Sequence, residues 1–239
     1  MPRPSLQCCV ALLGLLLPVS AACSSNAADP KDSLQPEPFV PLPDEEPDSI
    51  GYFLTRFDLS LRQWSELKLG ASSARQESVL DALERSLQQR AKDRKQELLQ
   101  VFESGAPVNR RIAAAALGFT RDASVLSPLL AALSEPDPEL VQKALLGIGV
   151  LQVASTPLAE IRQILLQDDD AWTRNNAAFA LLSLARVTNH PGELAETSRL
   201  GLIDSEPGVR AQCASTLGLL ADDAAVSALS GLLHDDTNL

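Results

Sequence analysis

The residue types that most often carry chemistry are scarce in this sequence of 239 residues, which has four cysteines and two histidines. His190 precedes a proline and His234 precedes an aspartate, so neither belongs to an HExxH pair that would bind zinc. The spacings G-x-S-x-G, CxxC and the P-loop are also missing from the sequence. We therefore predict a protein that is not an enzyme, with no catalytic residue, no metal ligand and no cofactor.

Runs of aspartate are the remaining candidates for a metal site. They occur at 168–170, 222–223 and 235–236, but they lack the alternating ligand spacing of a calcium-binding loop. Aspartate is also a preferred residue at the start of a helix. Helix capping is therefore the role that these runs indicate.

Cys23 is the cysteine whose surroundings point to a modification. An apolar stretch at 8–17 follows Arg3, and it is too short to cross a bilayer. Small residues at 20–22 then lead into Cys23, so residues 1–22 read as a bacterial export signal. The junction resembles the lipobox of bacterial lipoproteins, although Ser20 stands where leucine is usual. The resemblance implies lipid on Cys23, and Ser24 favours the outer membrane; the alternative is plain cleavage near Ala22 and a soluble periplasmic protein.

Cys213 is then the only thiol left, because Cys8 and Cys9 leave with the signal. It falls on an apolar helical stripe, so we predict a buried structural thiol rather than a nucleophile. No intramolecular disulfide is possible.

The overall composition narrows the class of protein. The net charge is −11, with 20 basic and 31 acidic residues, which argues against a nucleic-acid partner. Aromatic residues make up 4%, which argues against a β-sandwich or an aromatic-lined pocket. Residues 23–47 are rich in proline and acid and cannot bury enough apolar area to fold. We predict that they form an extended tether.

The rest of the chain has helical periodicity. Apolar residues at 50, 53, 54, 57, 61, 64 and 67 fall on one helix face, which predicts a helix from about 48 to 69. A second, longer helix is predicted from about 73 to 104, with Ser73 and Gln76 in a capping-box pattern. Together they predict an N-terminal helical hairpin over residues 48–105.

A motif recurs in the second half of the chain, at 109–118, 140–149, 173–182 and 209–218. A second apolar run follows each copy, at 125–133, 158–166, 194–203 and 226–233. A single helical hairpin cannot bury its apolar face alone, so the copies must stack. Small residues in the motif allow close approach of neighbouring helices, and Gly118, Gly149 and Gly218 are placed to end a helix in the left-handed conformation.

This pattern resembles short HEAT repeats of the kind found in phycobilisome-lyase-like proteins. Arg110, Arg174 and Arg210 and the Ala-rich helices ending in Leu-Gly carry the resemblance; Val141 replaces the arginine in the second copy. The resemblance implies an all-α protein, a right-handed α-solenoid of four HEAT-like hairpins over 106–239, preceded by the N-terminal hairpin.

The resemblance also implies where a partner would bind. In HEAT arrays the second helix of each pair lines the concave surface, and its outward residues here would be Ser127, Glu160, Gln163, Glu196, Arg199 and Ser227. Trp172 is a further candidate: it lies in a turn beside an acidic run, where it either packs across the turn or serves as a binding anchor. Their mixed chemistry is typical of a protein-binding surface.

The last run, 226–233, has no polar capping helix after it, so its open face is predicted to bind a partner or a second copy. The sequence thus predicts a non-enzymatic scaffold that binds protein in the bacterial cell envelope and contacts the membrane only through its lipid. The alternative is a periplasmic enzyme or enzyme-maturation factor of the bilin-lyase type.

Overall fold

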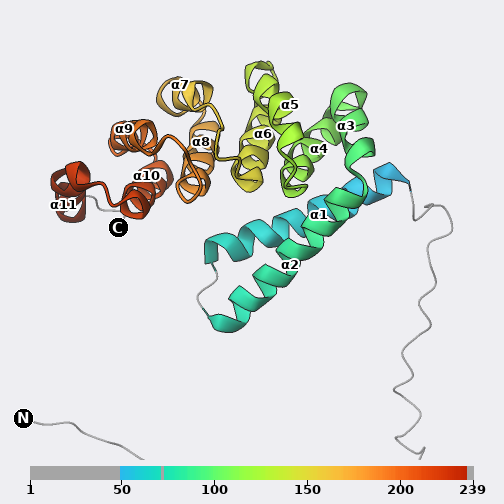
Figure 1. Ribbon diagram of the computed structural model, residues 1–239, viewed down its shortest axis with the longest axis horizontal. Coiled ribbons are helices and arrows are strands. Elements are labelled where there is room, and N and C mark those ends of the chain that lie inside the picture. The colour runs from blue at the N-terminus through green and yellow to red at the C-terminus, as the bar shows by residue number, and fades with distance from the viewer. Residues whose placement is uncertain (1–48, 71–72, 236–239) are drawn as a thin grey trace, which may run out of the picture. The chain divides into compact units, whose positions relative to one another are not determined.

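The computed structural model describes residues 49–70 and 73–235, which belong to one compact unit, Asp44–Leu239. The predicted signal at 1–22, Cys23 and the predicted tether at 23–47 lie outside the described residues. Within the described ranges the chain forms helices and no strand (Figure 1). The predicted all-α solenoid of helical hairpins is confirmed.

The helices follow each other in chain order. Their bounds are α1 Ile50–Gly70, α2 Ala74–Asp93, α3 Lys95–Ser104, α4 Pro107–Phe119, α5 Leu126–Ala131, α6 Pro138–Leu151, α7 Ala159–Gln167, α8 Ala171–Leu184, α9 Pro191–Gly201, α10 Pro207–Leu220 and α11 Val226–Asp235. Single 3-10 turns lie at Ala123–Val125, Ala132–Ser134 and Asp223–Ala225.

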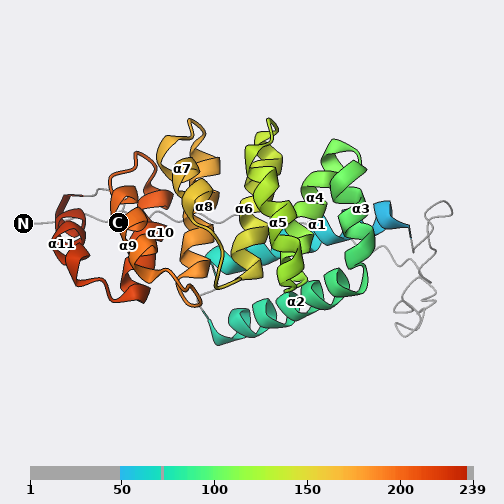
Figure 2. The same ribbon diagram turned by 45° about the horizontal axis from the view of Figure 1, so that its top comes forward.

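The helices pair as α3–α4, α5–α6, α7–α8 and α9–α10, and the helices α4, α6, α8 and α10 pack side by side as one layer (Figures 1 and 2). The repeated motif therefore forms the second helix of each pair, whereas the sequence analysis took it as the first. The reason is the short acidic and proline turns after α5, α7 and α9, because a tight turn joins antiparallel helices that pack on each other. The predicted repeat register was wrong by one helix.

The predicted helix over 73–104 is interrupted at Arg94, whose backbone leaves the helical region with φ −116° and ψ 20°. The two halves have different packing partners, which explains the break. The first half, α2, packs on α1 and buries Leu87, whereas α3 packs on α4 and buries Leu98 and Phe102. The capping prediction is confirmed, because the backbone N–H of Gln76 donates to the Ser73 hydroxyl at the start of α2.

The N-terminal hairpin docks on the second-helix layer through aromatic side chains of α1. The Trp64 ring meets the Phe119 ring of α4 edge-on at 5.3 Å and the Phe179 ring of α8 at 6.4 Å. Phe57 packs on Phe119 at 5.8 Å. The Trp64 indole N–H donates to Glu84 of α2 over 3.3 Å, so this buried tryptophan keeps its polar group satisfied.

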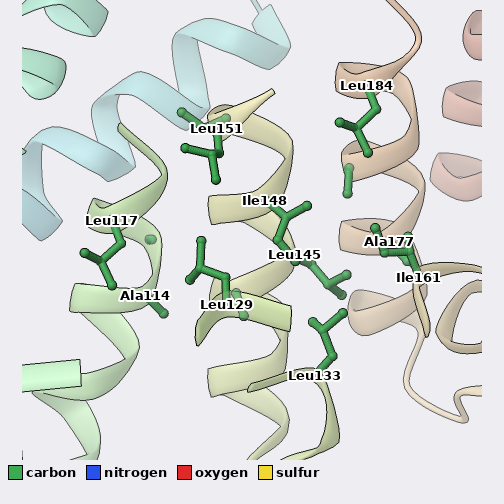
Figure 3. Close-up of a cluster of buried hydrophobic side chains, with 14 of the residues drawn as sticks. Ala114, Leu117, Leu129, Leu133, Leu145, Ile148, Leu151, Ile161, Ala177 and Leu184 are labelled. Atoms are coloured by element: carbon green, nitrogen blue, oxygen red, sulfur yellow. The ribbon is translucent and has the colours of Figure 1, made fainter. Parts of the chain in front are cut away.

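The core between the pairs is filled by aliphatic side chains of adjacent helices. Figure 3 shows side chains of α4, α6 and α8 converging with those of the intervening first helices. The labelled residues are at most a few per cent exposed, except Leu133, which is 8% exposed. They are Ala114, Leu117, Leu129, Leu133, Leu145, Ile148, Leu151, Ile161, Ala177 and Leu184. Such burial supplies the main favourable free energy of stacking.

The glycines predicted to end helices lie inside them instead. Helices α4, α6 and α10 continue past Gly118, Gly149 and Gly218, and the left-handed residue comes three positions later, at Arg121, Gln152 and Ala221. Gly118 and Gly149 are needed for packing: a β-carbon on Gly118 would lie 2.3 Å from the Gly147 carbonyl oxygen, and one on Gly149 would lie 2.9 Å from the Phe179 ring. A β-carbon on Gly218 would meet no atom of the described residues within 4 Å.

Candidate protein-binding surface

The arginines of the repeated motif hold the turns of the array together. Arg110 donates to the Phe102 carbonyl, Arg174 to the Asp168 and Asp169 carbonyls, and Arg210 to the Asp204 and Ser205 carbonyls. Arg110 thus binds a carbonyl oxygen in the last turn of α3, a group that a helix leaves unpaired. Arg174 and Arg210 bind carbonyl oxygens of the turns that follow α7 and α9. Their equivalent positions fit the repeat, and their contacts are structural.

Arg174 also ties one helix pair to the next. Its Nε lies 2.8 Å and its Nη2 3.0 Å from the Asp204 carboxylate, in a paired geometry that shields both side chains. Burial of Asp204 acts to raise its pKa, but the hydrogen bonds from Arg174 and the Glu206 N–H, together with the charges of Arg174 and Arg210, lower it. The Arg174 charge is therefore already neutralised within the protein.

Four of the predicted partner-binding residues share one face of the array. Glu160 and Gln163 are exposed on α7, and Glu196 and Arg199 lie on the neighbouring helix α9. Arg162 of α7 bridges to Glu196 at 3.0 Å, and Arg199 bridges to Asp222 at 2.6 Å. Because α7 and α9 are first helices of their pairs, the argument that placed these residues, with Ser127 and Ser227, on the concave surface does not hold.

Trp172 lies apart from these four residues. It sits in the first turn of α8 with 71% of its surface exposed, so it does not pack across the turn. Residues seven apart share a helix face, so Trp172 lies on the face of α8 that carries Phe179, against which Trp64 packs. The predicted partner-binding residues are therefore divided between two faces, and their role in binding stays a prediction.

The structure adds a group of apolar residues that sequence reasoning missed. Leu166 at the end of α7, Leu200 near the end of α9 and Ile203 after α9 are 39%, 43% and 87% exposed. They line one groove of about 510 Å³ between the α7–α8 and α9–α10 turns. In the sequence they belong to the second apolar runs 158–166 and 194–203, which were predicted to pack as helices. Their position around the helix distinguishes these exposed residues from buried ones, because the adjacent Leu165 and Leu202 point into the core.

The cysteine among the described residues is buried in the core. Cys213 is a free, buried thiol whose pKa burial raises to about 12, so it stays protonated and unreactive at neutral pH. Its sulfur packs where a β-carbon on Gly201 would lie, 2.4 Å away. Within residues 49–70 and 73–235, no three His, Cys, Asp or Glu side chains gather to hold a metal ion. No helix in those ranges has the length and apolar character to cross a bilayer.

The C-terminal helix α11 presents apolar side chains on an open side. Val226 is 58% and Leu233 77% exposed, whereas Leu229 and Leu232 pack against the core. The face beyond α10 and α11 is thus accessible within the described part of the chain.

Comparison with known proteins agrees with this architecture. A family model for HEAT repeats matches residues 95–182, which is less than half of the chain. The match begins at the first residue of α3 and ends within α8, in register with the pairs α3–α4, α5–α6 and α7–α8. No curated protein matches the chain. The middle of the chain is therefore similar to HEAT repeats, and the same helix pairing continues through α9 and α10.

Proposed function

We propose that this protein is a non-enzymatic scaffold that binds another protein of the bacterial cell envelope. One observation carries the proposal: the packed helix array exposes the large apolar side chains of Leu166, Leu200 and Ile203 along one groove. Clustered exposed apolar residues on a rigid surface are typical of protein-interaction sites. Protein interaction is also the common role of HEAT-like arrays, with which residues 95–182 agree.

We further propose that the protein is exported and anchored by lipid on Cys23, in the outer membrane facing the periplasm. The support is the sequence of residues 1–22, the cysteine that follows them and the acidic, proline-rich stretch at 23–47. The extended stretch would hold the helical array away from the membrane surface.

A crosslinked pull-down from envelope fractions tests binding. The full chain should recover a distinct protein, and the purified chain should carry no stoichiometric small molecule or metal by mass spectrometry. Leu59→Asp on α1, where the leucine is 55% exposed, serves as a matched surface control and should recover the same protein. A bound cofactor with no captured protein would instead support an enzyme or maturation factor.

Mass spectrometry of the N-terminal peptide and cell fractionation test the anchor. The mature chain should begin at an acylated Cys23, and the protein should fractionate with the outer membrane. Cys23→Ser should move it to the soluble fraction or leave it uncleaved. An unmodified N-terminus near residue 22 would contradict lipidation and leave export intact.

Self-association through the open face of α11 is part of the same proposal. Light scattering of the unlipidated chain should show a dimer or larger species that Leu233→Glu disrupts, since Leu233 is exposed and its replacement leaves the core intact. A monomer in both samples would exclude self-association and leave the proposed binding of another protein unaffected.

A further inference from the structure

The groove between the ends of α7 and α9 combines apolar walls with acidic charge. Leu165, Leu166, Leu200 and Ile203 contribute aliphatic surface, and Asp168 and Asp169 stand on the α7–α8 turn. A volume of about 510 Å³ is within the range of pockets that accept ligand groups. Both turns also contribute backbone, which fixes the position of the walls.

The charge of the groove follows from its hydrogen bonds. The Asp169 carboxylate makes no hydrogen bond or ion pair within the described residues, and Asp168 accepts only the N–H of Asp170, at 2.9 Å. Arg174 is committed to Asp204, so its charge is not available to a ligand. Among the residues that line the groove, the three carboxylates of Asp168, Asp169 and Asp204 outnumber the one guanidinium of Arg174, which leaves an excess of two negative charges.

The two features together define the partner. Burial of a large apolar side chain of the ligand against the exposed aliphatic residues would favour binding. The net negative charge of the groove would favour a cation beside that side chain. An acidic segment or an anionic lipid surface would be repelled. Asp168 and Asp169 are solvent-exposed or half-exposed, so the charge contributes mainly to selectivity and the apolar contact to affinity.

We propose that this groove docks a segment of the partner protein in which a large aliphatic or aromatic side chain stands next to lysine or arginine. The inference rests on the proposed protein-binding function and names the surface and the chemistry of the ligand. The apolar side chain would lie against Leu200 and Ile203, with the cation at Asp168 and Asp169. Docking would extend along α7 and α9 toward Glu160 and Glu196, which are also acidic.

Photocrosslinking tests the groove in the full-length, exported protein. A benzophenone amino acid replaces Ile203, which is 87% exposed, and separate chains carry it at Val108 on α4 and at Leu59 on α1 as controls. The probe at 203 should capture a partner peptide that contains an apolar residue within a few positions of lysine or arginine. The double variant Asp168→Asn, Asp169→Asn should lower that capture roughly threefold to tenfold, as loss of two exposed charges predicts.

The possible outcomes separate this inference from the proposed function. Two outcomes would contradict docking in the groove and leave the scaffold function standing. One is capture of a partner at 108 or 59 but not at 203. The other is capture at 203 that the double variant leaves unchanged. Capture of a second copy of this chain, or of an acidic segment, also overturns it. No capture at any position, with an empty pull-down, overturns both proposals.

Discussion

Glycine sets the distance between adjacent helix pairs. At the α4–α6 crossing, a β-carbon on Gly118 would lie 2.3 Å from the Gly147 carbonyl oxygen, and one on Gly147 would lie 2.6 Å from the Ala114 carbonyl oxygen. Both values are far below contact distance, and the obstructing atoms are backbone, which cannot rotate away. The helices therefore approach as closely as their main chains allow, and the neighbouring alanines complete that contact.

Alanine at Gly118 should therefore destabilise the protein by about 1–3 kcal/mol, because the crossing must open to admit a methyl group. Gly218 is the matched control: it has open space around it, so Gly218→Ala should stabilise the protein by up to about 1 kcal/mol through helix propensity. Urea unfolding followed by circular dichroism measures both. Equal effects of the two substitutions would contradict a packing role for Gly118.

The N-terminal hairpin is held to the array by a small aromatic cluster. Trp64 is only 3% exposed and contacts rings on α4 and α8, so one side chain of α1 touches two separate helix pairs. Polar contacts reinforce the docking, since Arg121 beyond α4 donates to Glu84 of α2 over 3.2 Å. The hairpin thus packs directly on the layer formed by α4, α6 and α8.

Trp64→Ala should lower the free energy of unfolding by about 3–5 kcal/mol, the cost of deleting a buried tryptophan. Trp172→Ala removes an exposed ring and should change stability by less than about 0.5 kcal/mol. Hydrogen exchange should show faster exchange in α1 and α2 of the Trp64 variant than in α6. If both variants unfold like the wild type, the hairpin is not docked through Trp64.

Carboxylates at three turns of the array have lowered pKa values in the folded protein. The pKa of Asp122 is lowered from 3.8 to about 2 by a hydrogen bond from Lys95 and by the Ser124 N–H. Arg111 lowers the pKa of Asp137, and Thr173 lowers that of Asp170. Each group starts or precedes a helix, so the same residues cap helices and connect successive pairs.

Acid should therefore destabilise the protein. A carboxyl group with a lowered pKa in the folded state binds fewer protons than in the unfolded state, so its contribution is complete above about pH 5 and is lost as pH falls toward about 2. The melting temperature should drop between pH 5 and pH 2.5, and Asp122→Asn should show a smaller drop than the wild type. A melting temperature independent of pH over this range would contradict the assignment.

Local sequence patterns determined the helical elements, the repeat and several caps. Spacing of apolar residues, the Ser73 cap and the aspartates at 137 and 170 act over a few residues, so they can be read without the fold. The start of α10 shows the limit of such local patterns: Glu206 occupies the N-cap, and the Ser205 hydroxyl before it accepts a hydrogen bond from Arg174. Even here the outcome depended on a residue 31 positions away.

Tertiary structure alone decided how the helices pair, why the glycines are needed and which exposed apolar residues come together in one groove. The left-handed turns show the reason. Arg121 and Gln152 adopt φ 54° where glycine would be less strained, and their side chains hydrogen-bond each other over 2.6 Å, while Gln152 also reaches the Ser183 carbonyl at 3.2 Å. Contacts between neighbouring repeats fix these positions, and the groove at Ile203 arises in the same way, because periodicity within one helix does not specify the neighbour it meets.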